Sequence, residues 1–210
     1  TAGAPILPTP VIGVVGVLED ASHVRSRVFQ DAGLDIVLLG ENHGELGGSA
    51  YLTTFLGTIS GVPPALNLAA EGALQRFLVA EAGLGAITSA HDCSDGGFVV
   101  ALAECCFDSG GIGADVDVPA ASGDGEVGMA AATLFGESAT RVILGVKPEA
   151  STALLERARS AGVAAQRVGA TGGTQIRVAI DGVVAIECPV SEAEDRWTNG
   201  FSQWLESPPQ

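Results

Sequence analysis

Four consecutive apolar residues, Ile36-Val37-Leu38-Leu39, lie between Asp35 and Gly40 and constrain the fold more than any other feature of the sequence. A strand with one face in water alternates apolar and polar side chains, so an uninterrupted apolar run predicts a strand covered on both faces. Strand-like and helix-like stretches alternate along the rest of the chain. We therefore expect an α/β (α+β) protein with a mixed sheet flanked by helices.

Periodicity and turn residues place the other elements. We expect further strands at 86–90, 141–146 and 175–182, and helices at 49–56, 66–82, 95–107, 128–135, 149–162 and 190–205. The strand, helix, strand order near the end of the chain predicts a partly ferredoxin-like topology. In the last helix, Trp197, Phe201 and Trp204 are spaced by four and three residues, so we expect these aromatics to pack onto the body of the protein.

A separate segment precedes the first buried strand. Residues 4–10 are proline-rich and predict an extended lead, and Val11–Leu18 is apolar and β-branched, which predicts a strand. Because residues 19–32 are polar and end at Gly33, we place a domain boundary near residue 34: residues 1–34 are a remnant of a preceding domain, and residues 35–210 form the main domain. An exposed apolar strand at 11–18 would favour pairing with another chain, including dimerisation.

Charge and cysteine content exclude several classes of function. Ten basic and 25 acidic residues give a net charge of −15, which would repel nucleic acid and an anionic membrane surface, so neither is expected as a partner. The four cysteines show no C-x-x-C pairing and no histidine spacing for zinc. Reduced, mostly buried thiols and the lack of a long apolar run predict a cytoplasmic protein.

The segment from His91 to Gly97 concentrates more chemistry than any other. It joins a predicted strand to a predicted helix and contains Asp92, Ser94 and Asp95. Mg²⁺ prefers hard oxygen ligands such as aspartate, and free amides at a helix start attract phosphate oxygens. The alternative is purely structural: Ser94 or Asp95 caps the helix, and His91 is a satisfied structural histidine.

Two other polar stretches are less specific. Residues 40–49 form a glycine-rich turn before a helix but lack a phosphate-loop lysine, so we interpret them as a tight connection. In the stretch before the 141–146 strand, Glu137 could bind a metal or a substrate hydroxyl, or could pair with Arg141. No serine has the surroundings of a catalytic nucleophile, and no catalytic residue is assigned.

Several segments match one family in order along the chain. They are 8–16, 45–52 (E-L-G-G-S-x-Y-L), 89–104 (beginning S-A-H-D-x-S-D-G-G), 134–142, 168–173 and the Trp197 helix. On these segments the chain resembles the carboxy-terminal portion of the synthetase subunit of phosphoribosylformylglycinamidine synthase, within the AIR synthase-related superfamily. The fold implied by the resemblance is that of an AIR synthase C-terminal domain, and the activity implied is the ATP-dependent conversion of formylglycinamide ribonucleotide to the amidine in purine biosynthesis.

The resemblance also implies roles for single residues. Asp92 corresponds to a Mg²⁺ ligand and Ser94 to a contact of the nucleotide, ATP or ADP. Glu137 and Ser138 correspond to substrate contacts, although Ala139 stands where the family usually has glutamine.

Other implications concern the whole protein. The family's catalytic histidine and main ATP-binding residues are expected upstream of Thr1, so this chain alone should lack turnover. The implied partners are the rest of the synthetase chain, a glutaminase subunit and a small accessory subunit. The alternatives are a structural half that docks partners without a ligand, or a domain of a related enzyme such as AIR synthetase, selenophosphate synthetase or thiamine-phosphate kinase.

Overall fold

A computed structural model of the protein describes residues 11–122 and 128–206, whose centre is one seven-stranded sheet. The strand order is β2-β4-β1-β5-β3-β6-β7, and every neighbouring pair is antiparallel except β3 and β6, which are parallel. The expected mixed sheet flanked by helices is therefore confirmed. The strands are β1 (Asp35–Leu39), β2 (Ile87–Asp92), β3 (Ala114–Val118), β4 (Val142–Val146), β5 (Ala165–Thr171), β6 (Gln175–Ile180) and β7 (Val183–Pro189).

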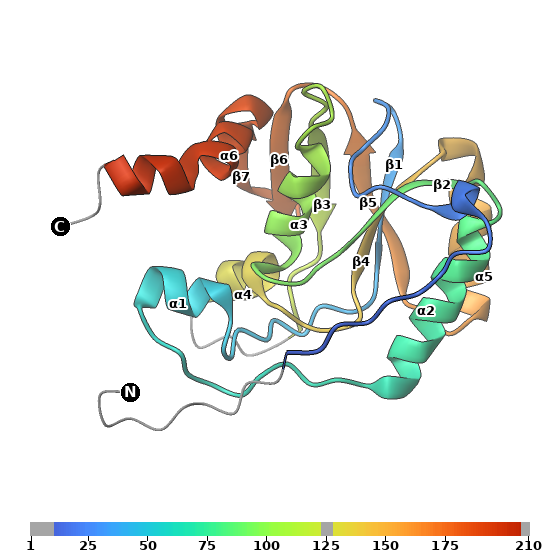
Figure 1. Ribbon diagram of the computed structural model, residues 1–210, viewed down its shortest axis with the longest axis horizontal. Coiled ribbons are helices and arrows are strands. Elements are labelled where there is room, and N and C mark those ends of the chain that lie inside the picture. Colours follow the sequence, from blue (N-terminus) through green and yellow to red (C-terminus); the bar gives the residue numbers. More distant parts are fainter. Residues whose placement is uncertain (1–10, 123–127, 207–210) are drawn as a thin grey trace.

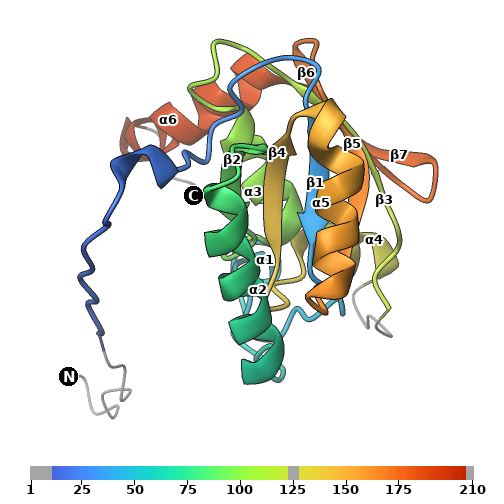
Figure 2. The same ribbon diagram turned by 90° about the vertical axis from the view of Figure 1, so that its right-hand side faces the viewer.

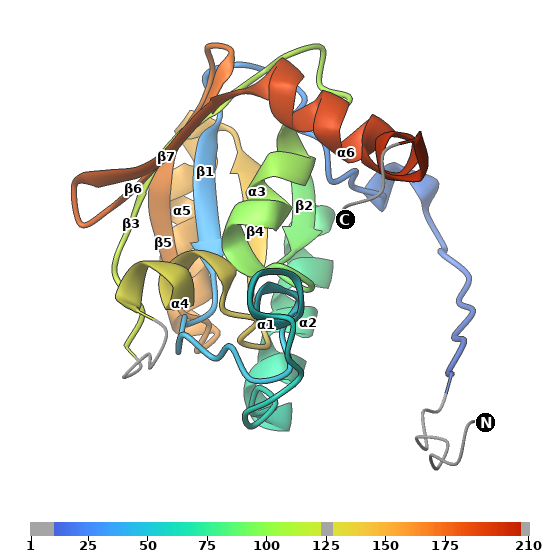
Figure 3. The same cartoon turned by 90° about the vertical axis from the view of Figure 1, so that its left-hand side faces the viewer.

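Helices cover both faces of this sheet. In Figure 2, α2 and α5 lie in front of the sheet, whereas α3, α4 and α6 lie on the opposite side, which Figure 3 shows. Their bounds are α1 (Ala50–Leu56), α2 (Leu68–Ala82), α3 (Gly97–Cys106), α4 (Met129–Phe135), α5 (Pro148–Ser160) and α6 (Val190–Glu206), with a short 3-10 helix, η1, at Ala21–His23. No helix in the described part of the chain is both long enough and apolar enough to cross a bilayer.

Strand β1 is apolar on both of its faces because each face packs in a separate core. All five of its residues are buried. Ile36 and Leu38 belong to the core under α3, while Val37 and Leu39 belong to the core under α2 and α5. The unbroken apolar run therefore fills two cores from one strand, as a period of two residues requires.

The topology contains a split strand–helix–strand unit. Strands β4 and β5 are joined by α5 and both pair antiparallel with β1, which lies between them. This is the arrangement of half a ferredoxin-like fold, so the expected topology is confirmed. The strand that closes the unit is β5, however, and not the predicted strand at 175–182, which instead pairs with β3 as β6.

Three strands were missing from the sequence prediction. Strand β3 has the sequence ADVDV with alternating burial, inside a glycine- and acid-rich connection, and β5 is interrupted by Gly169. At Gly169 a Cβ atom would lie 2.0 Å from the carbonyl oxygen of Asp115, so the close approach of β3 requires glycine there. The third strand, β7, is mostly exposed at the edge of the sheet.

The predicted strand at Val11–Leu18 is wrong. These residues have no regular secondary structure, and Val15 is 97% exposed. A strand needs a hydrogen-bonded neighbour, and no described segment pairs with this one. The proline-rich residues 4–10 lie outside the described residues, and the domain boundary near residue 34 stays a prediction. Closer to that boundary, Phe29 is buried in the core and donates its backbone N–H to the carbonyl of Cys105 (2.8 Å).

The prediction for the last helix is only partly correct. Trp197 packs against Phe107 with 5.5 Å between ring centroids, and the guanidinium of Arg27 lies 5.7 Å from the Trp197 ring. Phe201 is 73% exposed and does not pack on the body. The side chain of Trp204 is outside the described part.

Candidate functional site

Several polar turns of the protein lie together at one end of the central strands. Strands β1 and β2 end there and β4 begins there, because Leu39 and Asp92 are both register partners of Val142. The turns that follow or precede these residues are therefore neighbours in space. This brings residues 40–48, 93–96 and 136–141, which are far apart in sequence, to a common place at the lower side of Figure 1.

A cleft of about 330 Å³ lies between these turns. Three of the four residues predicted to bind ligands, Asp92, Ser94 and Glu137, line it, and Ser138 does not. The remaining lining residues are Glu71, Leu74, Cys93, Ala139, Thr140, Arg141 and Val142. The turn after β2 is thus open to a cleft and is not sealed inside the core.

Asp92 is the most accessible carboxylate of the predicted site, with 67% of its side chain exposed. The hydroxyl of Ser94 donates a hydrogen bond to its carboxylate. This hydrogen bond is the main cause that lowers the pKa of Asp92, and the nearby His91 adds to it. Asp92 is therefore ionised at neutral pH and presents negative charge to the cleft.

His91 has a structural role in this arrangement. Its Nε2 lies 2.7 Å from the Glu104 carboxylate on α3, and its Nδ1 lies 3.4 Å from Asp92. Only 17% of its side chain is exposed. The histidine thus ties the end of β2 to α3, as expected for a satisfied structural residue.

The start of α3 is formed by two glycines with positive φ angles. Gly96 (φ 78°) is the N-cap residue and has no side chain to cap the helix, so neither Ser94 nor Asp95 is the N-cap. At Gly97 (φ 70°) a Cβ atom would lie 2.5 Å from the carbonyl oxygen of Gly136. The glycine therefore allows α3 to approach the turn after α4 directly.

Glu137 binds backbone amides. Its Oε1 accepts hydrogen bonds from the N–H of Gly96 (2.8 Å) and of Ala50 (2.9 Å), at the starts of α3 and α1. A carboxylate at helix N-termini is stabilised by the orphan amides and by the helix dipole. The alternative pairing with Arg141 does not occur among the described residues.

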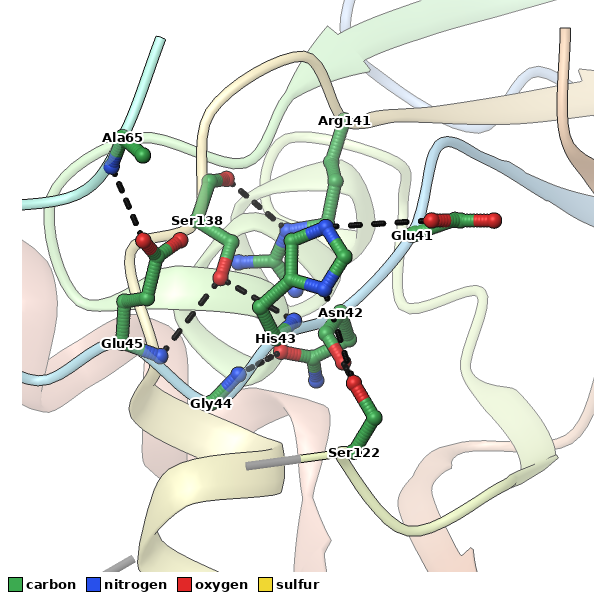
Figure 4. A network of polar contacts seen from close by, with 9 residues as sticks. All are labelled: Glu41, Asn42, His43, Gly44, Glu45, Ala65, Ser122, Ser138 and Arg141. Carbon is green, nitrogen blue, oxygen red and sulfur yellow. Dashed lines mark hydrogen bonds and ion pairs between the residues drawn. The ribbon is translucent and has the colours of Figure 1, made fainter. Parts of the chain in front are cut away.

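Ser138 and Arg141 stabilise the neighbouring loop (Figure 4). The fully buried Ser138 hydroxyl accepts hydrogen bonds from the N–H of His43 (3.2 Å) and of Glu45 (3.5 Å). Arg141, 2% exposed, donates from Nε to the carbonyl of Ser138 (3.0 Å) and from Nη2 to the carbonyl of Gly136. Burial lowers the pKa of Arg141. These contacts favour a structural role for Ser138; its substrate contact stays a prediction.

Sequence reasoning missed this role of Arg141. The available signal was a basic residue placed directly before a fully buried strand, in a chain with only ten basic residues. Such a residue must find polar partners close by, because an unpaired buried charge is costly.

The acidic residues of the cleft fit only a partial metal site. In the described part of the chain, no group of three or more His, Cys, Asp or Glu side chains is close enough to hold a metal ion. Glu71 accepts hydrogen bonds from Thr140 (2.8 Å) and Gln75 (2.8 Å), and Glu137 is bound to amides. Asp92 thus remains as a single available carboxylate. Mg²⁺ fits such a site when water and phosphate oxygens supply the other ligands.

Two more clefts, of about 400 and 300 Å³, lie at the same end of the strands. Both are lined by Gly40, Glu41 and Ala164, so they meet at the end of β1. Asn42 lines the larger cleft, but its side chain already donates to the carbonyl of Thr133 (2.8 Å) and accepts from the N–H of Gly44 (3.0 Å). The glycine-rich loop is therefore a tightly bonded connection, as expected.

Comparison with known proteins agrees with this fold. Among curated proteins, the chain is 40% identical over 209 residues to phosphoribosylformylglycinamidine synthase subunit PurL of Anaeromyxobacter sp. (strain Fw109-5) and 42% identical over 199 residues to that of Thermobifida fusca. These matches cover 95% and 94% of this chain but 26% and 25% of the relatives. The chain thus spans about a quarter of the length of the curated relatives it matches.

Solved structures share the same fold. Thermotoga maritima PurL complexed with FGAR superposes with a TM-score of 0.66 at 22% identity, over 83% of this chain and 30% of that one. The same protein complexed with ATP gives a TM-score of 0.64 at 20% identity, over 83% of this chain and 28% of that one. Residues 31–182 match the family model described as AIR synthase related protein, C-terminal domain. The chain therefore belongs to the AIR synthase related protein family and contains its C-terminal domain.

Proposed function

We propose that this chain is the carboxy-terminal part of a phosphoribosylformylglycinamidine synthase, an ATP-dependent carbon–nitrogen ligase of purine biosynthesis, and that it contributes a Mg²⁺–nucleotide half-site. Relatives with that name, 40% identical over 95% of the chain, support the proposal. The observation that carries the half-site is the cleft lined by both Asp92 and Ser94, in which the Ser94 hydroxyl donates a hydrogen bond to the ionised Asp92 carboxylate.

The chain's own groups suggest how a nucleotide would bind. Mg²⁺, when bound, would neutralise phosphate charge, and Asp92 would supply one of its oxygen ligands. Ser94 would orient the Asp92 carboxylate and could donate its hydroxyl to a phosphate oxygen once Asp92 binds the metal. Gly96 and Gly97 let the start of α3 pack closely against the turn after α4, which holds the cleft residue Glu137 in place.

The substrate contacts receive weaker support. Glu137 remains in the proposal because it lines the cleft, but its observed hydrogen-bond partners are amides of the protein. We propose that Glu137 and Ser138 mainly hold the walls of the cleft in place. Among the described residues that line the cleft we assign no nucleophile and no general base, so turnover would need residues from the rest of a longer synthetase.

The proposal extends to location and assembly. Residues 1–34 would complete a preceding domain, and residues 35–210 would form the domain described above. The longer synthetase would act in the cytoplasm together with glutaminase and accessory subunits, as the family resemblance implies.

Calorimetry with Mg·ADP tests the half-site on the intact chain. Asp92→Ala should weaken binding by about tenfold or more, because it removes a metal ligand. Asp31→Ala is the matched control, since this exposed aspartate lies near Thr171 at the opposite end of the strands. Equal binding by wild type and Asp92→Ala would reject the half-site.

A structural half without a ligand is the competing function. It is favoured by Glu137, whose carboxylate already occupies the amide of Gly96 that an anion would otherwise bind. Absence of any heat of binding for Mg·ADP and Mg·ATP, with an intact fold, would support this second candidate.

A further inference from the structure

The segment between Glu45 and Glu71 contains no charged residue, in a protein with 35 charged residues and a net charge of −15. It comprises α1 and the long connection to α2, which runs along the lower side of the molecule in Figure 1. A solvent-facing segment of an acidic protein ordinarily carries charge. The absence of charged residues over 46–70 suggests that a partner covers this surface.

Large apolar side chains project from the same segment. Ile59 is 81% exposed and Val62 is 84% exposed. We call the surface they form the uncharged face. Its six large hydrophobic residues, each more than half exposed, are Phe55, Leu56, Ile59, Val62, Leu66 and Leu68. All six lie between residues 55 and 68, and exposed apolar side chains that cluster in this way are typical of an interaction site.

The backbone under the uncharged face is held in place. The N–H of Gly48 donates to the carbonyl of Ser60 (2.8 Å), and the N–H of Ala65 donates to the Glu45 carboxylate (2.8 Å). At Gly47 a Cβ atom would lie 1.9 Å from the carbonyl oxygen of Val62, so the two parts of the loop are in direct contact. A surface fixed before binding loses less entropy on binding.

We infer that the uncharged face packs against another domain of the same longer protein, on an apolar surface of low charge. The inference rests on the proposed function, because the relatives that suggest it are about four times as long as this chain. A second copy is disfavoured as the occupant, since two chains of charge −15 repel each other. The apolar segment 11–18, which also has no partner in the described structure, adds a second surface that a longer chain could cover.

The test uses this chain and, as the probe, the first three-quarters of the Thermobifida fusca relative expressed separately. Light scattering should show a one-to-one complex. The double variant Ile59→Asp, Val62→Asp should weaken it by at least about tenfold, because it places unpaired charge in an apolar contact. Val183→Asp, Val184→Asp on the exposed β7 is the control and should bind like wild type.

Other results would overturn the inference. Equal binding by both double variants, or no complex with wild type, would exclude the uncharged face as the contact. Self-association of the wild type that the Ile59→Asp, Val62→Asp variant abolishes would identify a second copy as the occupant. Thermal melts verify that each variant folds. Because the isolated Ile59→Asp, Val62→Asp chain should bind Mg·ADP like wild type, failure of the half-site and failure of the interface are distinguishable.

Discussion

Glu81 on α2 and Arg157 on α5 form a two-point ion pair, with Arg157 Nε 2.6 Å and Nη2 2.7 Å from the two carboxylate oxygens. Glu81 is 2% exposed, and both of its carboxylate oxygens bind this partner. The pair joins the two helices that cover one face of the sheet (Figure 2). The hydrogen bond to Glu81 also raises the pKa of Arg157.

Arg157→Ala should therefore lower the free energy of unfolding by about 2 kcal/mol, because a buried carboxylate loses its hydrogen-bonding partner. Urea unfolding followed by circular dichroism measures the change. Arg159→Ala, an exposed neighbour on the same helix, is the control and should change stability by less than about 0.5 kcal/mol. Equal effects of the two variants would show that the ion pair does not stabilise the packing of α2 and α5.

Glu137→Ala should lower the free energy of unfolding by about 1–3 kcal/mol, because two backbone amides lose their acceptor. Glu137→Gln keeps an oxygen in place and should cost clearly less. Chemical denaturation of both variants checks the order. Glu187→Ala, an exposed glutamate on β7, is the control. A larger loss for Gln than for Ala would contradict the role of Glu137 as an amide acceptor.

Gly97→Ala should lower the free energy of unfolding by more than about 2 kcal/mol, since it combines a positive φ angle with a contact to backbone that cannot move away. Gly110→Ala separates these two causes. Gly110 has a φ of 76°, but a Cβ atom there would have no neighbour within 4 Å, so its variant should cost only about 1 kcal/mol. Thermal unfolding of both variants gives the comparison, and similar losses would mean that the contact with Gly136 is unimportant.

Ser94→Ala should raise the pKa of Asp92, because it removes the hydrogen bond that mainly lowers it. A carboxyl group with a lowered folded-state pKa adds stability above its unfolded pKa, and this stability is lost as pH falls through the folded pKa. The wild type should therefore keep the contribution of Asp92 to lower pH than the variant does. Carbon-13 NMR titration of the aspartate carboxyl groups measures both values. An unchanged pKa would show that the hydrogen bond does not form in solution.

Cys93, Cys105 and Cys106 should resist alkylation at pH 8 in the native protein. Burial raises the pKa of each thiol, to about 12 for Cys93 and Cys106, so almost no thiolate is present. Iodoacetamide labelling with mass spectrometry, in buffer and in urea, tests this directly. Cys188, which is only partly buried, is the internal comparison. Rapid native labelling of Cys93 would mean that the turn after β2 opens easily.

The sequence predicted correctly those elements in which the pattern of apolar side chains reflects their burial. The apolar run of β1 is buried as predicted, and Phe98, Val99 and Leu102 are buried on α3, where the sequence predicts a helix. Strands β3 and β5 were missed because pairing stabilises them more than their own composition does. For the same reason, apolar residues 11–18 were wrongly assigned to a strand: β-propensity without a neighbour does not form one.

The candidate site was predictable to a similar extent. Asp92, Ser94 and Glu137 were identified by residue type and position, and the structure places them in one cleft. The amide contacts of Glu137 depend on how α1 and α3 meet, although Ala50 and Gly96 are far apart in the sequence. No local sequence pattern predicts that the starts of α1 and α3 lie side by side, so the sequence could not show whether Glu137 contacts a ligand or accepts hydrogen bonds from the backbone.

The position of β1 between β4 and β5 has a consequence for synthesis on the ribosome. Asp35 pairs with Val146 and Ala170, so β1 cannot pair until β4 and β5 are synthesised, more than a hundred residues later. Until then, β1, in which four of the five residues are apolar, has no hydrogen-bonded neighbour on either side, and such nascent segments are prone to aggregate. Conditions that slow translation between residues 40 and 165 should thus increase the dependence of this protein on chaperones.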